Sequence, residues 1–173
     1  NAKYRSAMGE YWAVWNVGEY TFAPYKVVWK EVSSRFEAAV IGSAEFGVLD
    51  EKTRIPDHKL MLLPCASEDE AHYYCGLVNS RVLREFAEAV SLSTSRGTRI
   101  FEKIQIPPFN PESSAHRAVA ELSREAHEGH ILDDRFEEGL SEAVGAALGS
   151  GTHTYTPTDI DFDWEDSLVS EIR

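Results

Sequence analysis

The hydrophobic period of this chain changes at Ser67. Before it, residues 11 to 30 hold seven aromatic side chains, interrupted by Gly18 and Pro24, which is typical of strands broken by turns. After it, apolar residues recur at intervals of three and four, which is the period of a helix buried along one side. We therefore expect an α+β fold in which a mixed β-sheet carries one long helix and is followed by a helical C-terminal appendage.

Three strands are predicted before Ser67. In the segment from Tyr25 to Lys30, alternation places Tyr25, Val27 and Trp29 on a core face and Lys26, Val28 and Lys30 on a charged face. The two other strands are expected at 38–41 and 59–63. The stretch between them contains Gly and Asp, and its pattern does not specify its turns.

The long helix is predicted over residues 67–90. Ser67 followed by Glu70 has the spacing of a capping box, and the apolar positions that follow are Ala71, Tyr74, Leu77, Val78, Val82 and Phe86. A polar loop is expected over 91–98, and then a strand-like run over 99–106 that Pro107 and Pro108 end.

Two further helices are predicted after Pro111. The first carries the stripe Ala115, Val119, Leu122 and Ala126 and stops at Gly129, and the second starts at Asp134 and carries Phe136, Leu140, Val144 and Leu148. We divide the chain into a domain at 1–110, a helical appendage at 111–150 and an acidic tail at 151–173.

The charge follows the same division. The formal net charge is −12, which lacks the basic signature of a freestanding nucleic-acid binder. Residues 1–110 hold 13 Lys+Arg and 14 Asp+Glu, whereas residues 111–173 hold 4 and 15. The acidity therefore belongs to the C-terminal third, which we expect to face away from any polyanion or toward a protein partner.

Two cysteines are too few for a disulfide framework, and no apolar run is long enough to cross a membrane or to act as a signal peptide. We therefore expect a cytoplasmic protein with no membrane partner. Because the chain starts at Asn1-Ala2 without a methionine, we expect it to be part of a longer protein.

The motifs of catalysis are incomplete. The string Ile106-Pro107-Pro108-Phe109 has isoleucine where an adenine methyltransferase needs a polar acceptor, and the sequence has neither a Gly-x-Gly-x-x-Gly run nor a P-loop. The carboxylate residues that a nuclease needs to bind its metal ion are incomplete around Asp57.

Two pairs of residues have the spacing of metal ligands, His72 with Cys75 and His127 with His130. Each pair has too few ligands for a closed zinc site, so packed cysteines and surface histidines are the simpler interpretation. A Ser/His/Asp triad is left open by composition, although no serine stands in a Gly-x-Ser-x-Gly elbow.

Three blocks of the sequence resemble one known family in order and spacing. They are YTFAPYKVVW at 20–29, EAHYYCGLVNS at 70–80 and IQIPPFN at 104–110, and the segment AELSREAH at 120–127 follows them. Together these blocks resemble the C-terminal target-recognition (TaqI-like specificity) domain of restriction-modification N6-adenine DNA methyltransferases.

The resemblance implies a module that reads DNA and is not catalytic by itself. In that family an upstream catalytic domain binds S-adenosylmethionine, flips the adenine and methylates its N6. No cofactor is expected in this segment, and the expected partners are double-stranded DNA and the upstream methyltransferase domain of the same chain.

DNA reading requires cations for phosphates and side chains that reach base edges. Candidates lie on or after the first strand and around the polar loop, and they are Lys26, Lys30, Arg35, Ser95, Arg96, Arg99 and Lys103. Arg96 is the candidate for a bidentate contact with guanine.

Two other classes of function stay open. One is a protein-interaction or regulatory module whose acidic segment at 111–173 binds a basic partner or mimics DNA. The other is a small hydrolase or metal enzyme built around the histidines, for which bound zinc would be the sign.

Overall fold

The computed structural model describes residues 17–33, 35–46, 49–90, 106–129 and 133–149. The fold is α+β, and its elements in chain order are the 3-10 helix η1 (Glu19–Phe22), the strands β1 (Tyr25–Lys30), β2 (Ala38–Ile41), β3 (Ala44–Phe46), β4 (Leu49–Lys52) and β5 (Leu60–Cys65), and the helices α2 (Glu68–Asn79), α3 (Arg81–Val90), α5 (Ser114–His127) and α6 (Asp134–Gly149).

Three strands form an antiparallel sheet in the order β2-β1-β5, and β3 pairs with β4 in a separate two-stranded sheet. In the larger sheet Val27 of β1 stands opposite Val40 of β2 and Leu63 of β5, which fixes the register on both sides. The β1 and β2 segments match the sequence prediction, and β5 begins and ends one or two residues later than predicted. The β3–β4 pair occupies the stretch whose turns the sequence left open.

The central position of β1 corrects the predicted division of its faces. Val27 and Trp29 are 0% and 2% exposed, as a core face requires, but Val28 and Lys26 on the other face are also buried, at 7% and 1%. Only Lys30, at the end of the strand, is exposed. Alternation assigns residues to faces, but it does not report that both faces of a central strand are covered.

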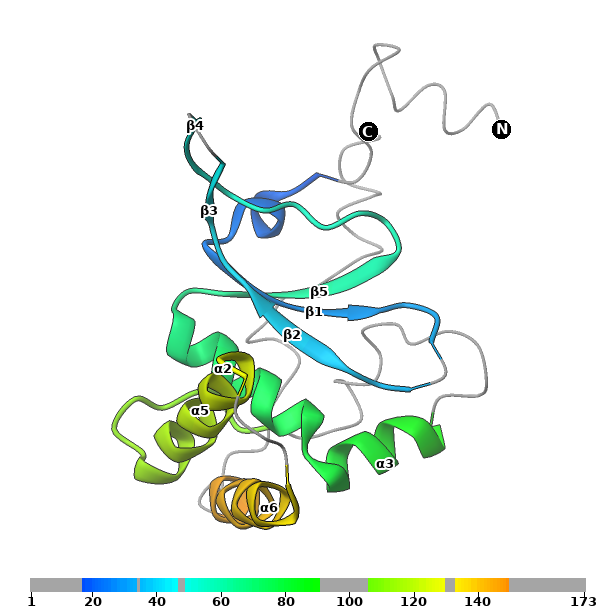
Figure 1. The fold of residues 1–173 in the computed structure, drawn as a ribbon, viewed down its shortest axis with the longest axis vertical. Coiled ribbons are helices and arrows are strands. Elements are labelled where there is room, and N and C mark those ends of the chain that lie inside the picture. Colours follow the sequence, from blue (N-terminus) through cyan, green and yellow to red (C-terminus); the bar gives the residue numbers. More distant parts are fainter. Residues whose placement is uncertain (1–16, 34, 47–48, 91–105, 130–132, 150–173) are drawn as a thin grey trace, which may run out of the picture.

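The helices lie together on one side of the three-stranded sheet, and η1 and the β3–β4 pair lie on the other (Figure 1). Helix α2 packs on the sheet, α5 packs against α2, and α6 packs against α5. Val119 of α5 and Val144 of α6 belong to the same hydrophobic core as Val27 and Leu77. The segments predicted as a domain at 1–110 and an appendage at 111–150 therefore share one core, and the tail at 151–173 lies outside the described residues.

The predicted single helix over 67–90 is wrong, because the chain breaks at Ser80. Ser80 has φ −59° and ψ 147°, and its hydroxyl donates to Leu77 O (2.6 Å) while accepting from Leu83 N (3.5 Å). The break shifts the phase of α3, so that Leu83 and Ala87 enter the core, at 7% and 1% exposed. Val82 and Phe86, the predicted core residues, are 61% and 38% exposed.

The first helix boundary follows the prediction. Ser67 accepts from Glu70 N (3.2 Å), and the Glu70 carboxylate accepts in return from Ala66 N (2.7 Å), so that two free amides at the helix start are satisfied.

Helices α5 and α6 also follow the prediction. Ser113 caps α5, and Gly129, just after its end, has φ +88°, a conformation that glycine adopts without strain. Leu140 and Val144 of α6 are buried.

Within the described ranges, no helix combines the length and the apolar character that crossing a membrane requires.

Candidate nucleic-acid interface

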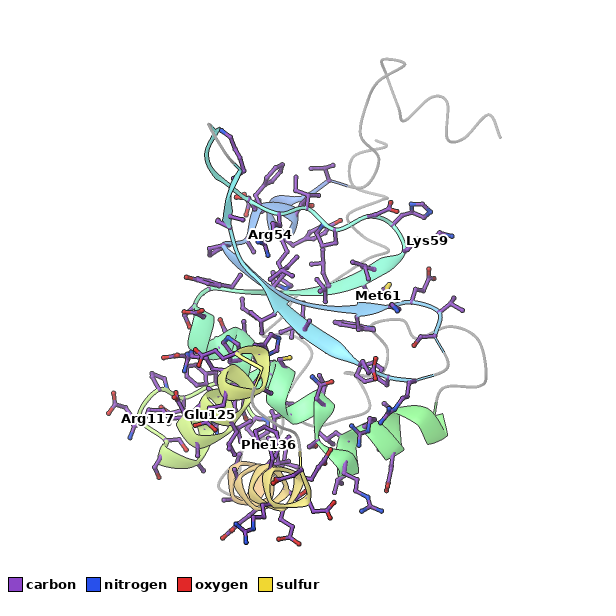
Figure 2. All side chains as sticks on the ribbon, in the orientation of Figure 1. Arg54, Lys59, Met61, Arg117, Glu125 and Phe136 are labelled. Atoms are coloured by element: carbon purple, nitrogen blue, oxygen red, sulfur yellow. The ribbon has the colours of Figure 1, made fainter. Side chains whose placement is uncertain are left out.

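The sheet face turned away from the helices carries exposed cations. Lys30 ends β1 and stands opposite Leu60, the first residue of β5. Lys59 directly precedes Leu60, and its carbonyl oxygen accepts from Glu31 N (3.1 Å), so Lys30 and Lys59 lie at the same end of the sheet. Figure 2 shows Lys59 and Arg54 on the side of the sheet opposite the helices. Among the described residues these three cations form no salt bridge, although Lys59 also interacts electrostatically with the exposed carboxylate of Asp57.

Lys26 does not belong to this surface, which corrects its predicted position on an exposed face. Its side chain is 1% exposed, and Nζ donates to Ala23 O (2.6 Å), just after the end of η1. Desolvation lowers the pKa of the Lys26 ammonium. The side chain therefore fixes the turn between η1 and β1 and does not reach a phosphate on the surface.

Arg35 lies in the connection between β1 and β2 and is exposed. Its guanidinium approaches the carboxylate of Glu37 at 3.9 Å, with both side chains about two-thirds exposed, at 67% and 68%. A pair this loose contributes little to stability, so Arg35 can exchange it for another anion.

The remaining predicted DNA-binding residues, Ser95, Arg96, Arg99 and Lys103, lie outside the described residues. The structure adds Arg54 and Lys59 to the candidate surface. Neither residue was predicted from the sequence, because both stand in the connection between β4 and β5, where no hydrophobic pattern assigns a face. The only sequence signal for these two residues is a cation in a short loop beside the end of a strand, and this signal is weak.

Charge is divided between the two layers. Residues 17–65, which form the strands and η1, hold 6 Lys+Arg and 7 Asp+Glu, whereas the described parts of 68–149 hold 5 and 14. The formal net charges are therefore −1 and −9. The strong negative field belongs to the helices, on the far side of the sheet from Arg54 and Lys59 (Figures 1 and 2).

A second polar cluster lies between α2 and α5, inside the protein. His72 Nδ1 is 3.2 Å from the Ser123 hydroxyl, and the two residues are 4% and 5% exposed. Burial, assisted by the neighbouring His127 and Arg124, lowers the pKa of His72 to about 4. Since neither side chain reaches the surface, the His72–Ser123 pair is a structural hydrogen bond and does not act as a nucleophile with its base.

The cysteines are buried as expected, whereas His72 is not the surface histidine that the simpler interpretation assumed. Cys75 donates from Sγ to Ala38 O (3.5 Å), and burial raises the pKa of its thiol to about 12. Burial also raises the pKa of the Cys65 thiol. Neither thiol has the thiolate character of a reactive cysteine. No group of three or more metal-binding side chains occurs among the residues that the structure describes.

The segment Ile106-Pro107-Pro108-Phe109 is held against the helices. Tyr73 donates from its hydroxyl to Pro107 O (3.0 Å), and Phe109 N donates to the Tyr74 hydroxyl (3.4 Å). His116 stacks on Tyr73 with ring centroids 4.5 Å apart, and its Nδ1 accepts from Asn110 N (3.0 Å). The Pro107 carbonyl is therefore occupied within the fold, which fits a structural role for this segment.

No protein-family model and no curated protein matches this chain.

Proposed function

We propose that this chain is the DNA sequence-recognition module of an N6-adenine DNA methyltransferase or of a fused restriction-modification enzyme. The observation that carries the proposal is the separation of charge between the layers, in which Lys30, Arg54 and Lys59 have no salt bridge among the described residues and the acidic helices lie on the other side of the sheet. The ordered sequence blocks that resemble target-recognition domains supply the specific family.

The proposed surface contains the two kinds of group that DNA reading needs. Lysine and arginine neutralise phosphates and set the orientation of the protein on the duplex. Phe22, at the end of η1, is 56% exposed and offers an apolar contact of the kind made with a thymine methyl group. Base-specific hydrogen bonds are assigned to the predicted loop residues Ser95, Arg96 and Arg99.

The module has no catalytic step of its own in this proposal. The parent protein is an adenine-specific methyltransferase of the cytoplasm, and its upstream domain supplies S-adenosylmethionine and the transfer of the methyl group. The module fixes where on the duplex that domain acts, and the acidic helices face away from the DNA.

The test is binding of the 173-residue chain to duplex DNA, measured by fluorescence anisotropy over a series of salt concentrations. We expect weak binding that falls steeply as salt rises, because few phosphates are contacted and each contact releases counterions. Selection from a random duplex pool should then return one preferred sequence.

Charge reversals on the two layers form the matched comparison. Lys30→Glu, Arg54→Glu and Lys59→Glu should each weaken binding, whereas Arg117→Glu on α5 should not. Equal weakening by Arg117→Glu would place the DNA on the helices, and absence of binding at low salt would refute the proposal. In that case the acidic described parts of 68–149, with 14 Asp+Glu against 5 Lys+Arg, would favour a basic protein partner.

A further inference from the structure

The outer edge of β2 is closed by side chains from two helices. Asn79 of α2 binds both backbone groups of Ala38, since Ala38 N donates to Asn79 Oδ1 (2.9 Å) and Asn79 Nδ2 donates to Ala38 O (2.8 Å). Two residues further along the strand, Val40 N donates to Nε2 of His127 (3.0 Å), in the last turn of α5. Because β2 is an outer strand of the sheet, these contacts replace the ones that another strand would make.

The two hydrogen bonds of the His127 ring determine its protonation. Nδ1 lies 2.8 Å from Ser123 O, and a carbonyl oxygen only accepts, so Nδ1 carries a proton. Val40 N–H only donates, so Nε2 must carry a lone pair. The imidazole is therefore neutral, and a second proton on Nε2 would point at the amide hydrogen of Val40.

The ring is also open to solvent, so that a proton can reach it. Charged and titratable groups face it from both helices. On α2, His72 lies edge-on to His127 with ring centroids 5.0 Å apart, and Asp69 is hydrogen-bonded to Arg124 of α5. On the strand side the nearest charged residue in sequence is Glu37, which pairs loosely with Arg35.

The place of the ring at the end of α5 favours a charged imidazole. A cation in the last turn of a helix is stabilised by the free carbonyl groups there, and Glu128 follows His127 at the C-cap of α5. The Val40 bond requires the neutral ring, whereas the helix end favours the charged one. The ring cannot satisfy both at once.

We propose that His127 is a pH-sensitive latch between the end of α5 and the outer edge of β2. The neutral ring holds Val40 N–H, and protonation releases it, which opens this edge while Asn79 keeps Ala38 bound. The latch stands on the fold alone and does not depend on DNA binding.

Amide hydrogen exchange measured by NMR on the 173-residue chain tests the latch. Between about pH 7.5 and about pH 5, the protection factor of Val40 should fall about fivefold to tenfold, as expected for one lost hydrogen bond. The protection of Ala38 should stay within about twofold, because the Asn79 amide does not titrate in this range. An equal fall at both amides would mean that the whole fold opens, and it would overturn the proposal.

His127→Gln is the matched variant, since glutamine keeps an acceptor oxygen and has no titrating group. Its Val40 protection should be independent of pH, and pH dependence that persists in this variant would refute the latch. The imidazole ¹⁵N shifts of the unmodified chain give a reading that needs no variant. At neutral pH they should report the neutral form with the proton on Nδ1, and a proton on Nε2 would overturn the inference.

Discussion

Gly76 of α2 lies so close to Val119 of α5 that a β-carbon on Gly76 would be 2.8 Å from Val119 Cγ1 and 2.9 Å from the Val119 carbonyl oxygen. The absence of a side chain at position 76 is thus a condition for the contact of these two helices. Neither helix can move away without disturbing the core that both share with the sheet.

Gly76→Ala should therefore destabilise the protein. Overpacking costs about 1–3 kcal/mol, which exceeds the gain of about 1 kcal/mol that alanine brings to a helix interior. Urea denaturation should show a lower free energy of unfolding. Gly145→Ala on α6 is the control, because nothing lies within 4 Å of the added carbon, and it should raise stability by about 0.5–1 kcal/mol. A gain of stability in both variants would contradict the close approach.

Ser80→Ala should also destabilise the chain, because the hydroxyl serves the ends of both α2 and α3. Loss of such a cap typically costs about 1 kcal/mol. Ser141→Ala, in the middle of α6, should instead be neutral or slightly stabilising, since alanine has the higher helix propensity. Thermal and urea unfolding of the two variants would check this prediction, and equal effects would count against a capping role for Ser80.

Stability should decrease with acidity below the ordinary pKa of histidine. The unfolded chain binds a proton at His72 near pH 6.5, whereas the folded chain does so only near 4, so the unfolded state takes up more protons between these values. The free energy of unfolding should therefore fall as the pH drops from about 6.5 to about 4, by about 3 kcal/mol from this residue. Burial also lowers the pKa of His116, which acts in the same direction.

Urea unfolding at a series of pH values measures this dependence. His72→Gln should reduce the slope, because it removes the titrating group and keeps polar atoms near Ser123. His58→Gln is the control, since the His58 side chain is 78% exposed. A pH profile that the His72 variant leaves unchanged would contradict the assignment.

Two lysines of β1 should differ sharply in DNA binding. Lys26→Met should leave the affinity unchanged, because this side chain is buried and bound to Ala23 O. Lys30→Met should weaken binding, and it should reduce the slope of log affinity against log salt by about one. Anisotropy titrations at several salt concentrations separate the two, and the opposite ranking would contradict the proposed surface.

Local patterns were sufficient for much of the fold. Alternation located β1, the Ser67–Glu70 spacing located the start of α2, and the apolar stripes located α5 and α6. The break at Ser80 was not predicted, because the apolar spacing continues through Val82 and Phe86 as it would in an unbroken helix. At the break the Ser80 hydroxyl bonds to Leu77 O and Leu83 N, and the apolar spacing does not report these contacts.

The candidate surface was less predictable. Lys26 is buried and bound to Ala23 O, just after η1, and no local pattern reports this contact. Arg54 and Lys59 became candidates only when the sheet placed them on the side opposite the helices. Likewise, the bond between His127 and Val40 joins residues 87 positions apart, and the His-x-x-His spacing of His127 and His130 does not report it.

The side-chain amide of Asn79 also affects the tendency of the protein to aggregate. An outer strand with free backbone groups is a template on which further chains assemble edge to edge, and it is a common origin of fibrils. By occupying both groups of Ala38, the Asn79 side chain, together with His127 on Val40 N, closes the outer edge of β2. The same contacts that order the sheet within one molecule therefore protect this edge from polymerisation between molecules.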